Sequence, residues 1–168
     1  DLILGPEMKS TGEVMGIDKT FLSSYVKSQI ACGNILPSNG KVFISIDDNN
    51  KNQIILIAEK LKKLNFELIA TKGTSKYLNE NGIETSQINK VKEGSPHIVD
   101  ALTKNEIDLV INTTKTQSSI RDSYSIRRTS LMYNIPYYTT IAGAKVAIDA
   151  IEHIKYNDFE IHSLQALN

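Results

Sequence analysis

The sequence predicts an α/β fold in which helices cover both faces of a parallel β-sheet. Two observations carry this prediction. Short apolar runs, typical of strands buried on both sides, alternate along the chain with longer stretches of helical periodicity. Turn-forming residues, such as Gly33, the cluster Pro37 to Gly40, and Gly82, fall between the two kinds of segment. Strict alternation makes each connection a right-handed crossover, so the helices form layers above and below the sheet.

A cluster of turn formers, Pro37-Ser38-Asn39-Gly40, marks the predicted domain boundary. Residues 1–37 precede it and are too few to bury a core of their own. Residues 38–168 carry the alternating pattern and are predicted to form the main domain.

The segment before the boundary predicts one amphipathic helix, from about Lys19 to Ala31. Asp18 is placed to cap its start, and Gly33 follows its end. Its apolar face has nothing to pack against within the segment. We therefore expect three of its residues to contact the main domain or another copy of the chain: Phe21, Leu22 and Tyr25.

The first half of the main domain predicts two strands, each followed by a helix. Lys41–Ile46 is a strongly apolar run and predicts a buried strand. Lys51–Leu64 then has the periodicity of a helix. Phe66–Ala70 is the second strand, and a short helix, Ser75–Asn81, is closed by Gly82.

The second half continues the alternation. Glu84–Ile88 is a weaker strand, and the helix after it begins directly behind a proline. Later segments follow the same rules of periodicity and length. In order, the remaining predicted elements are helix His97–Lys104, strand Ile107–Asn112, helix Ser119–Tyr133, strand Tyr137–Thr139 and helix Gly143–Ile154.

Composition excludes several classes of protein. The 168 residues carry 19 basic and 19 acidic side chains, so the net positive field of a general nucleic-acid or membrane-surface binder is missing. No apolar run approaches the roughly 20 residues that cross a bilayer. The single cysteine, Cys32, excludes an internal disulfide framework and suits a reducing compartment. We expect a cytoplasmic protein without nucleic-acid or membrane partners.

Small polar residues follow the predicted strands, where ligands of open α/β sheets bind. Gly73 permits close backbone approach, and Thr74 or Ser75 would cap the next helix, whose N–H groups favour an anion. Lysines add charge, while amides and hydroxyls orient oxygens or a sugar. The set suits a phosphate, although each residue alone is also explained by a cap, a turn or a solvated surface. The candidates are Ser45, Lys51, Thr71, Gly73, Thr74, Lys90, Asn112, Thr113 and Thr114.

The residues predict neither a metal site nor a catalytic pair. His97, His153 and His162 fall on different elements without cysteine or carboxylate ligands at suitable spacing, and His97 fits a core or capping role. Asp47 and Asp48 are carboxylates of the kind that binds Mg²⁺, but adjacent carboxylates before a helix are more often surface residues favoured by its dipole. The pattern favours binding over catalysis.

Several motifs resemble a known family. The opening stretch from Gly5 to Gly16 resembles the segment that closes the second ATP-grasp unit of carbamoyl phosphate synthetase large subunits. The remainder resembles the allosteric domain at that subunit's C-terminus, which has a three-layer, Rossmann-like fold shared with methylglyoxal synthase. The motifs are Ala70-Thr71-Lys72-Gly73-Thr74, Asn89-Lys90-Val91 through Pro96-His97-Ile98, Asn112-Thr113-Thr114, Asp122-Ser123 with Ile126-Arg127-Arg128, and Tyr137 to Thr140.

The resemblance implies a regulatory domain of a glutamine-hydrolysing ligase. The whole enzyme would make carbamoyl phosphate for pyrimidine and arginine biosynthesis, using a glutaminase small subunit, ATP, and Mg²⁺ or Mn²⁺. Residues 1–37 would be the end of the ATP-grasp unit and a linker, so this piece would be non-catalytic and hold no cofactor. The candidate phosphate residues match by position those that bind UMP or IMP in bacterial relatives. Tyr137 and Thr139 match an ornithine site.

Some positions depart from the family pattern. Thr116 and Gln117 stand where some members have Gly and Arg, and Tyr138 stands where some have Asp. The main alternative is methylglyoxal synthase, acting on dihydroxyacetone phosphate, but Asn112-Thr113-Thr114-Lys115 replaces its Gly-Gly-Asp stretch. The ATP-grasp-like opening argues against that enzyme and against a purine-synthesis cyclohydrolase domain. An interaction-only domain stays open, because the parent enzymes assemble partly through this region, and self-association is a further expectation.

Overall fold

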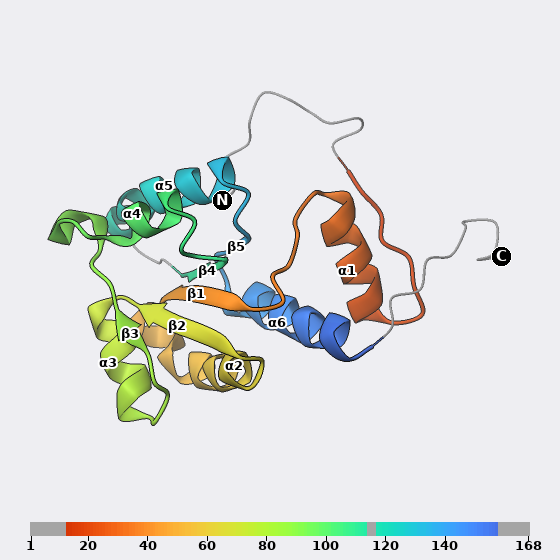
Figure 1. Ribbon diagram of the computed structural model, residues 1–168, viewed down its shortest axis with the longest axis horizontal. Helices are drawn as coiled ribbons and strands as arrows, with labels where there is room; N and C mark the ends of the chain where they lie inside the picture. The colour runs from red at the N-terminus through yellow and green to blue at the C-terminus, as the bar shows by residue number, and fades with distance from the viewer. Residues whose placement is uncertain (1–12, 114–116, 158–168) are drawn as a thin grey trace.

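The computed structural model describes residues 13–113 and 117–157 and has the predicted α/β architecture. In these ranges five parallel strands form one sheet in the order β3-β2-β1-β4-β5 (Figure 1). The chain winds outward from β1 to one side and then from β4 to the other, so the topology reverses between these two strands. The strands are β1 (Gly40–Ser45), β2 (Phe66–Ala70), β3 (Ser86–Gln87), β4 (Leu109–Asn112) and β5 (Tyr137–Tyr138).

Helices cover both faces of the sheet, as predicted. On one face lie α2 (Lys51–Lys63), α3 (Lys72–Glu80) and α6 (Ile141–Tyr156). On the other face lie α4 (Ile98–Thr103) and α5 (Gln117–Met132) (Figure 1). Short 3-10 turns, η1 (Asp48–Asn50) and η2 (Val91–Glu93), precede α2 and α4. None of the helices in the described ranges combines the length and apolar character needed to cross a bilayer.

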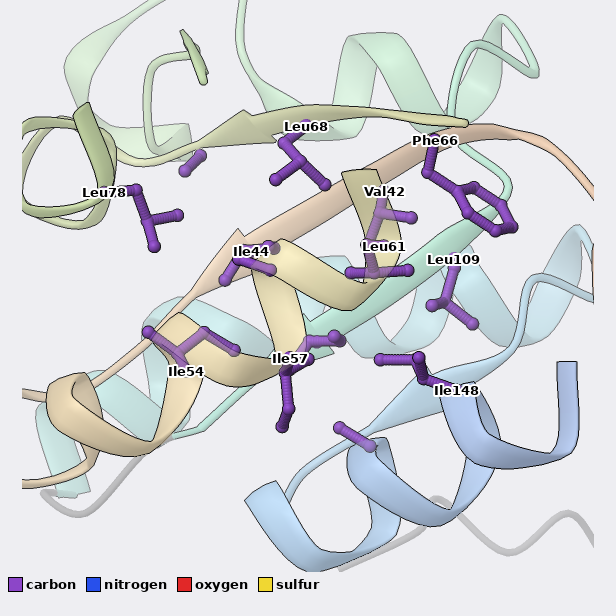
Figure 2. Close-up of a cluster of buried hydrophobic side chains, with 14 of the residues drawn as sticks. Val42, Ile44, Ile54, Ile57, Leu61, Phe66, Leu68, Leu78, Leu109 and Ile148 are labelled. Atoms are coloured by element: carbon purple, nitrogen blue, oxygen red, sulfur yellow. The ribbon is translucent and has the colours of Figure 1, made fainter. Parts of the chain in front are cut away.

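The sheet separates two apolar cores, because successive side chains of a strand point to opposite faces. On β1, Val42 and Ile44 pack under α2 and α6, whereas Phe43 packs under α4 and α5. Figure 2 shows the first core, where Leu61 of α2 and Ile148 of α6 approach the strands from the same side. Burial on both faces explains why β1 is continuously apolar rather than alternating.

The helix before the domain boundary starts later than predicted. It is α1 (Phe21–Ala31), and its N-cap is Thr20, whose hydroxyl accepts a hydrogen bond from Ser23 N at 3.2 Å. Asp18 does not cap the helix, because its carboxylate pairs with Lys27 Nζ at 2.7 Å. The helix starts two residues after the predicted start near Lys19, and the predicted cap at Asp18 is wrong.

The helix after β2 starts a turn earlier than predicted. α3 begins at Lys72, with Thr71 as the N-cap, and Ser75 N already donates to Thr71 O at 2.8 Å. Thr74 and Ser75 lie inside the helix rather than at its start, so their predicted capping role is wrong. The consequence for the site is that the helix begins directly at the carboxyl end of β2.

α1 packs against α6 at the side of the main domain (Figure 1). Val26 is only 1% exposed, and Ser23 Oγ lies 2.8 Å from His153 Nε2 of α6. Tyr25 is half-buried and its hydroxyl donates to that of Tyr138 at 3.4 Å. Phe21 is 68% exposed and does not pack on the main domain, so the alternative of a contact with another copy stays a prediction for this residue.

Candidate functional site

A cavity of about 430 Å³ lies at the carboxyl ends of the central strands. It opens where the topology reverses between β1 and β4, the place where open α/β sheets leave a crevice. Its volume falls within the range of small-molecule sites, about 300 to 1,000 Å³. The lining residues are Ser45, Ile46, Asp47, Thr71, Lys90, Val91, Lys92, Glu93, Asn112, Thr113, Ser123, Ser125 and Ile126.

Part of the predicted set comes together around this cavity: Ser45, Thr71, Lys90, Asn112 and Thr113. Three of them are polar side chains buried at the strand ends, since Thr71 is 4%, Asn112 2% and Thr113 7% exposed. Lys90 is exposed, follows β3 in the chain and is the N-cap residue of η2. Residues far apart in the chain thus contribute hydroxyl, amide and ammonium groups to one space.

Other predicted residues lie beside the cavity without lining it. Lys51 Nζ pairs with Asp48 Oδ1 at 2.6 Å. Gly73 is exposed in the first turn of α3, and Thr74 is buried with its hydroxyl accepting the first backbone N–H after β1 at 3.2 Å. Thr114 lies outside the described residues. Thr74 therefore has a structural role that ties α3 to the end of β1.

The start of α3 gives the site its positive end. The N–H groups in the first turn of a helix have no partner within the helix, and they carry the positive end of its dipole. Thr71, the N-cap, makes no side-chain capping bond, and its hydroxyl lies 3.4 Å from those of Ser45 and Thr74. Such a start, next to a cavity, is suited to an anion.

Hydrogen bonds within the loop that carries Lys90 fix the conformation of its backbone. Lys90 N donates to Glu93 Oε2 at 2.7 Å, and Asn89 Nδ2 donates to Gly94 O at 3.2 Å. At the base of the loop, Asn89 pairs with His97 in a parallel β-bridge. These bonds fix the backbone from which Lys90 reaches the cavity.

His97 is the N-cap of α4, one of the two roles predicted for it. Asp100 N donates to His97 Nδ1 at 3.3 Å, and His97 N donates back to Asp100 Oδ2 at 2.9 Å. The backbone N–H of His97 and the hydroxyl of Ser95 lower the pKa of Asp100 below its usual range. This capping arrangement anchors the far end of the Lys90 loop.

Asp47 is a site residue that the sequence reasoning missed. It lines the cavity, although it was predicted to be a surface residue at a helix start. Thr113 Oγ1 donates to Asp47 Oδ2 at 2.9 Å, and Asp47 N donates to Thr113 Oγ1 at 3.1 Å. The available signal was its position directly after the first strand, the rule that had already identified Ser45. Two further cavity residues lie on α5: Ser123, which stood only within a family motif, and Ser125, which had no signal.

Tyr137 does not line the cavity but contacts Asn112, which does. Asn112 Nδ2 donates to the Tyr137 hydroxyl at 2.8 Å, and the Arg127 guanidinium lies 6.0 Å from the centre of the Tyr137 ring. Burial raises the pKa of Tyr137 above its usual value, against the opposing effects of Arg127 and Asn112. Thr139, the other residue matched to an ornithine site, is half-buried. Burial, together with the bond from Tyr25, also raises the pKa of Tyr138.

Comparisons with known proteins agree with the resemblance in the sequence. The chain is 50% identical over 165 residues to the carbamoyl phosphate synthase large chain of Myxococcus xanthus (strain DK1622), covering 98% of this chain and 15% of that protein. It is 49% identical over 169 residues to the C-terminal section of the Methanopyrus kandleri large chain, covering 100% of this chain and 31% of that section. The chain therefore spans less than a third of these relatives.

Among solved structures, methylglyoxal synthase from Elizabethkingia anophelis NUHP1 has a TM-score of 0.52 and 22% sequence identity. The match covers 67% of this chain and 79% of that one, and it shows a shared fold. Residues 53–139, over half of the sequence, match the family model of the MGS-like domain. The matched segment runs from α2 to the residue after β5 and holds most of the cavity wall. With this fold and this match, the chain belongs to the MGS-like domain family.

Proposed function

We propose that this chain is the regulatory domain of a carbamoyl phosphate synthase large chain and that its cavity binds a nucleoside monophosphate of the UMP or IMP type. The observation that carries the proposal is the gathering of Ser45, Thr71, Lys90 and Asn112 around one cavity at the start of α3. The names of the relatives supply the parent enzyme.

The phosphate would lie between the first turn of α3 and Lys90. The helix start offers backbone N–H donors, and Lys90 adds a positive charge that can move toward an anion. The Thr71 hydroxyl lies at the start of α3, 3.4 Å from the Ser45 hydroxyl at the end of β1, and both residues line the cavity. Thr71 and Asn112 are buried at the cavity wall and are already held by hydrogen bonds to Ser45 and Tyr137, so they would meet a ligand with little further ordering.

Regulation would follow from a difference in nucleotide affinity between two states of the parent enzyme. A coupling free energy of about 1 to 3 kcal/mol changes substrate affinity roughly 5- to 150-fold. In this proposal the ligase chemistry, its ATP and its Mg²⁺ or Mn²⁺ belong to the rest of the large chain. The same proposal includes a glutaminase subunit as partner, a cytoplasmic location, an ornithine contact at Tyr137 and Thr139, and self-association of the chain.

Calorimetric titration with UMP and with IMP tests the binding. We expect Lys90→Ala to weaken binding of the preferred nucleotide about tenfold or more, the usual weight of a charged hydrogen bond. Lys76→Ala is the matched control, because Lys76 is exposed on α3 and pairs only loosely with Glu80 at 3.8 Å. Equal binding by the wild type and Lys90→Ala, or no binding of either nucleotide, would contradict the assigned site.

Methylglyoxal synthase remains the second candidate because a carboxylate, Asp47, lines the cavity. Elimination of phosphate from dihydroxyacetone phosphate needs such a base near the phosphate. Incubation of the chain with dihydroxyacetone phosphate, followed by a methylglyoxal assay, separates the two proposals. Turnover would replace the regulatory proposal with an enzymatic one, and its absence would leave ligand binding as the function.

A further inference from the structure

We infer that Asp47 makes the site selective for ribonucleotides over 2′-deoxyribonucleotides, by accepting a hydrogen bond from a ribose hydroxyl. The inference rests on the proposed nucleotide site. It concerns a residue that neither the sequence pattern nor the resemblance assigned to binding.

The cavity has a donor end and an acceptor end. The donors, at the ends of β2 and β3, are the first turn of α3 and Lys90. The acceptors, at the ends of β1 and β4, include the Asp47 carboxylate and the Asn112 amide, whose nitrogen already donates to Tyr137 at 2.8 Å. The end of β4, where Asn112 lies, is two strand spacings or roughly 10 Å from β2, and Asp47 follows the intervening strand β1 but is bonded to Thr113 at the end of β4.

A nucleoside monophosphate has the complementary polarity. Its phosphate is an acceptor with negative charge, and its ribose hydroxyls are donors. A carboxylate repels a phosphate placed beside it, so Asp47 fixes the orientation in which the phosphate lies toward α3 and the ribose lies toward β4. In that orientation a ribose hydroxyl is the ligand group suited to the carboxylate.

Thr113 holds Asp47 in place. Its hydroxyl accepts from Asp47 N at 3.1 Å and donates to Asp47 Oδ2 at 2.9 Å, so its single proton is committed to the carboxylate. Asn50 Nδ2 also donates to Asp47 Oδ2. An ionised carboxylate has about four acceptor positions on its two oxygens, so it can accept a hydrogen bond from a ligand in addition to those from the protein. Thr113 is therefore a positioning residue rather than a ligand donor.

The experiment compares UMP with dUMP, and IMP with dIMP, by calorimetry on the whole chain. For the wild type we expect the ribonucleotide to bind about 10- to 100-fold more tightly than its 2′-deoxy form, as for a hydrogen bond to a charged group. In Asp47→Ala we expect that ratio to fall toward one, while the affinity for the deoxynucleotide stays close to that of the wild type. The unchanged deoxynucleotide affinity shows that the site still folds.

Asp48→Ala is the matched control. It removes the neighbouring carboxylate, which is 89% exposed, pairs with Lys51 and does not line the cavity. This variant should keep the wild-type ratio. Equal binding of ribo- and deoxynucleotides by the wild type would overturn the inference and leave the proposed function intact. A ratio that persists in Asp47→Ala, or an equal loss of both affinities there, would also overturn it. Absence of any nucleotide binding would remove both proposals.

Discussion

Gly73 occupies a position where the protein alone does not require a glycine. A methyl group added there would meet no atom within 4 Å, and the residue is not among those with a positive φ. It lies in the first turn of α3, where the phosphate is proposed to approach the backbone. In the proposed site the ligand, rather than packing, would account for the glycine.

We therefore expect Gly73→Ala to separate stability from binding. Alanine is the better helix former, so the free energy of unfolding should rise by about 0.5 to 1 kcal/mol. The affinity for the nucleotide should fall by about fivefold, the loss of roughly one hydrogen bond to the phosphate. Urea denaturation and calorimetry on the same sample measure both effects. Unchanged affinity would place the phosphate away from α3.

Two threonines show how far the site could be predicted from residue types. Thr74 and Thr113 both follow strands and both carry hydroxyls suited to a phosphate. In the structure, the Thr74 hydroxyl accepts from Ile46 N, and the Thr113 hydroxyl is committed to Asp47. Both partners follow β1, whereas Thr74 follows β2 and Thr113 follows β4, so the sequence around each threonine does not reveal its partner. The sequence could predict that these polar residues gather at one edge of the sheet. It could not predict which hydrogen-bond partner within the protein each hydroxyl takes.

At the scale of elements, α2 and α6 are joined by a cluster of charges. Lys60 Nζ lies 2.6 Å from Asp149 Oδ1 and 2.5 Å from Glu152 Oε2, and Lys145 Nζ lies 3.2 Å from Asp149 Oδ2. Burial opposes ionisation of Asp149, but its bonds to Lys60 and Lys145 outweigh burial and lower its pKa. Burial likewise opposes the charge of Lys60, yet Asp149 and Glu152 raise its pKa.

We expect Asp149→Asn to lower the free energy of unfolding by about 1 kcal/mol near pH 7, as for a partly exposed ion pair. A lowered carboxyl pKa stabilises the fold above the unfolded value of about 3.9, and this contribution disappears as pH falls through the folded value. The difference between variant and wild type should therefore vanish in acid. Urea denaturation across pH measures it, with Glu59→Gln, an exposed carboxylate on α2, as the control. A difference that persists at low pH would assign the effect to packing.

The bounds of the predicted helices and strands were accurate where burial of apolar side chains determines them. They were inaccurate where hydrogen bonds determine them. β2 spans Phe66–Ala70 as predicted, because its apolar pattern reports a strand inside the sheet. The start of α3 was missed because an extended Thr71 begins the helix without a side-chain capping bond. β3 is shorter than the predicted Glu84–Ile88, since its length depends on pairing with β2 alone.

At the scale of the whole molecule, the two cores are built without α1. The buried residues of both clusters come from the sheet and the helices packed on it, and the earliest of them is Val42. α1 adds a separate contact, in which Val26 is covered against the main domain. The predicted boundary near Pro37 therefore leads to a testable division of the chain.

We expect the fragment of residues 38–168 to keep its sheet and to unfold cooperatively. Val26 is 1% exposed in the whole chain, so loss of its contact should lower the free energy of unfolding of the fragment by about 1.5 to 3 kcal/mol. Exposure of the α6 surface should also make the fragment less soluble. Far-UV circular dichroism, thermal unfolding and size-exclusion chromatography test this against the full chain. A fragment that fails to fold would make α1 part of a single cooperative unit, whereas unchanged solubility would contradict a covering role.

The shortness of β3 and β5 has a consequence for how copies of the chain can meet. A sheet edge presents backbone N–H and C=O groups that can template a strand from another molecule, which is a route to aggregation. Here each edge strand has only two residues, Ser86–Gln87 on one side and Tyr137–Tyr138 on the other. An incoming strand would find few groups to pair with. Contacts between copies would then be made by helix surfaces, where side chains rather than main chain decide which partner fits.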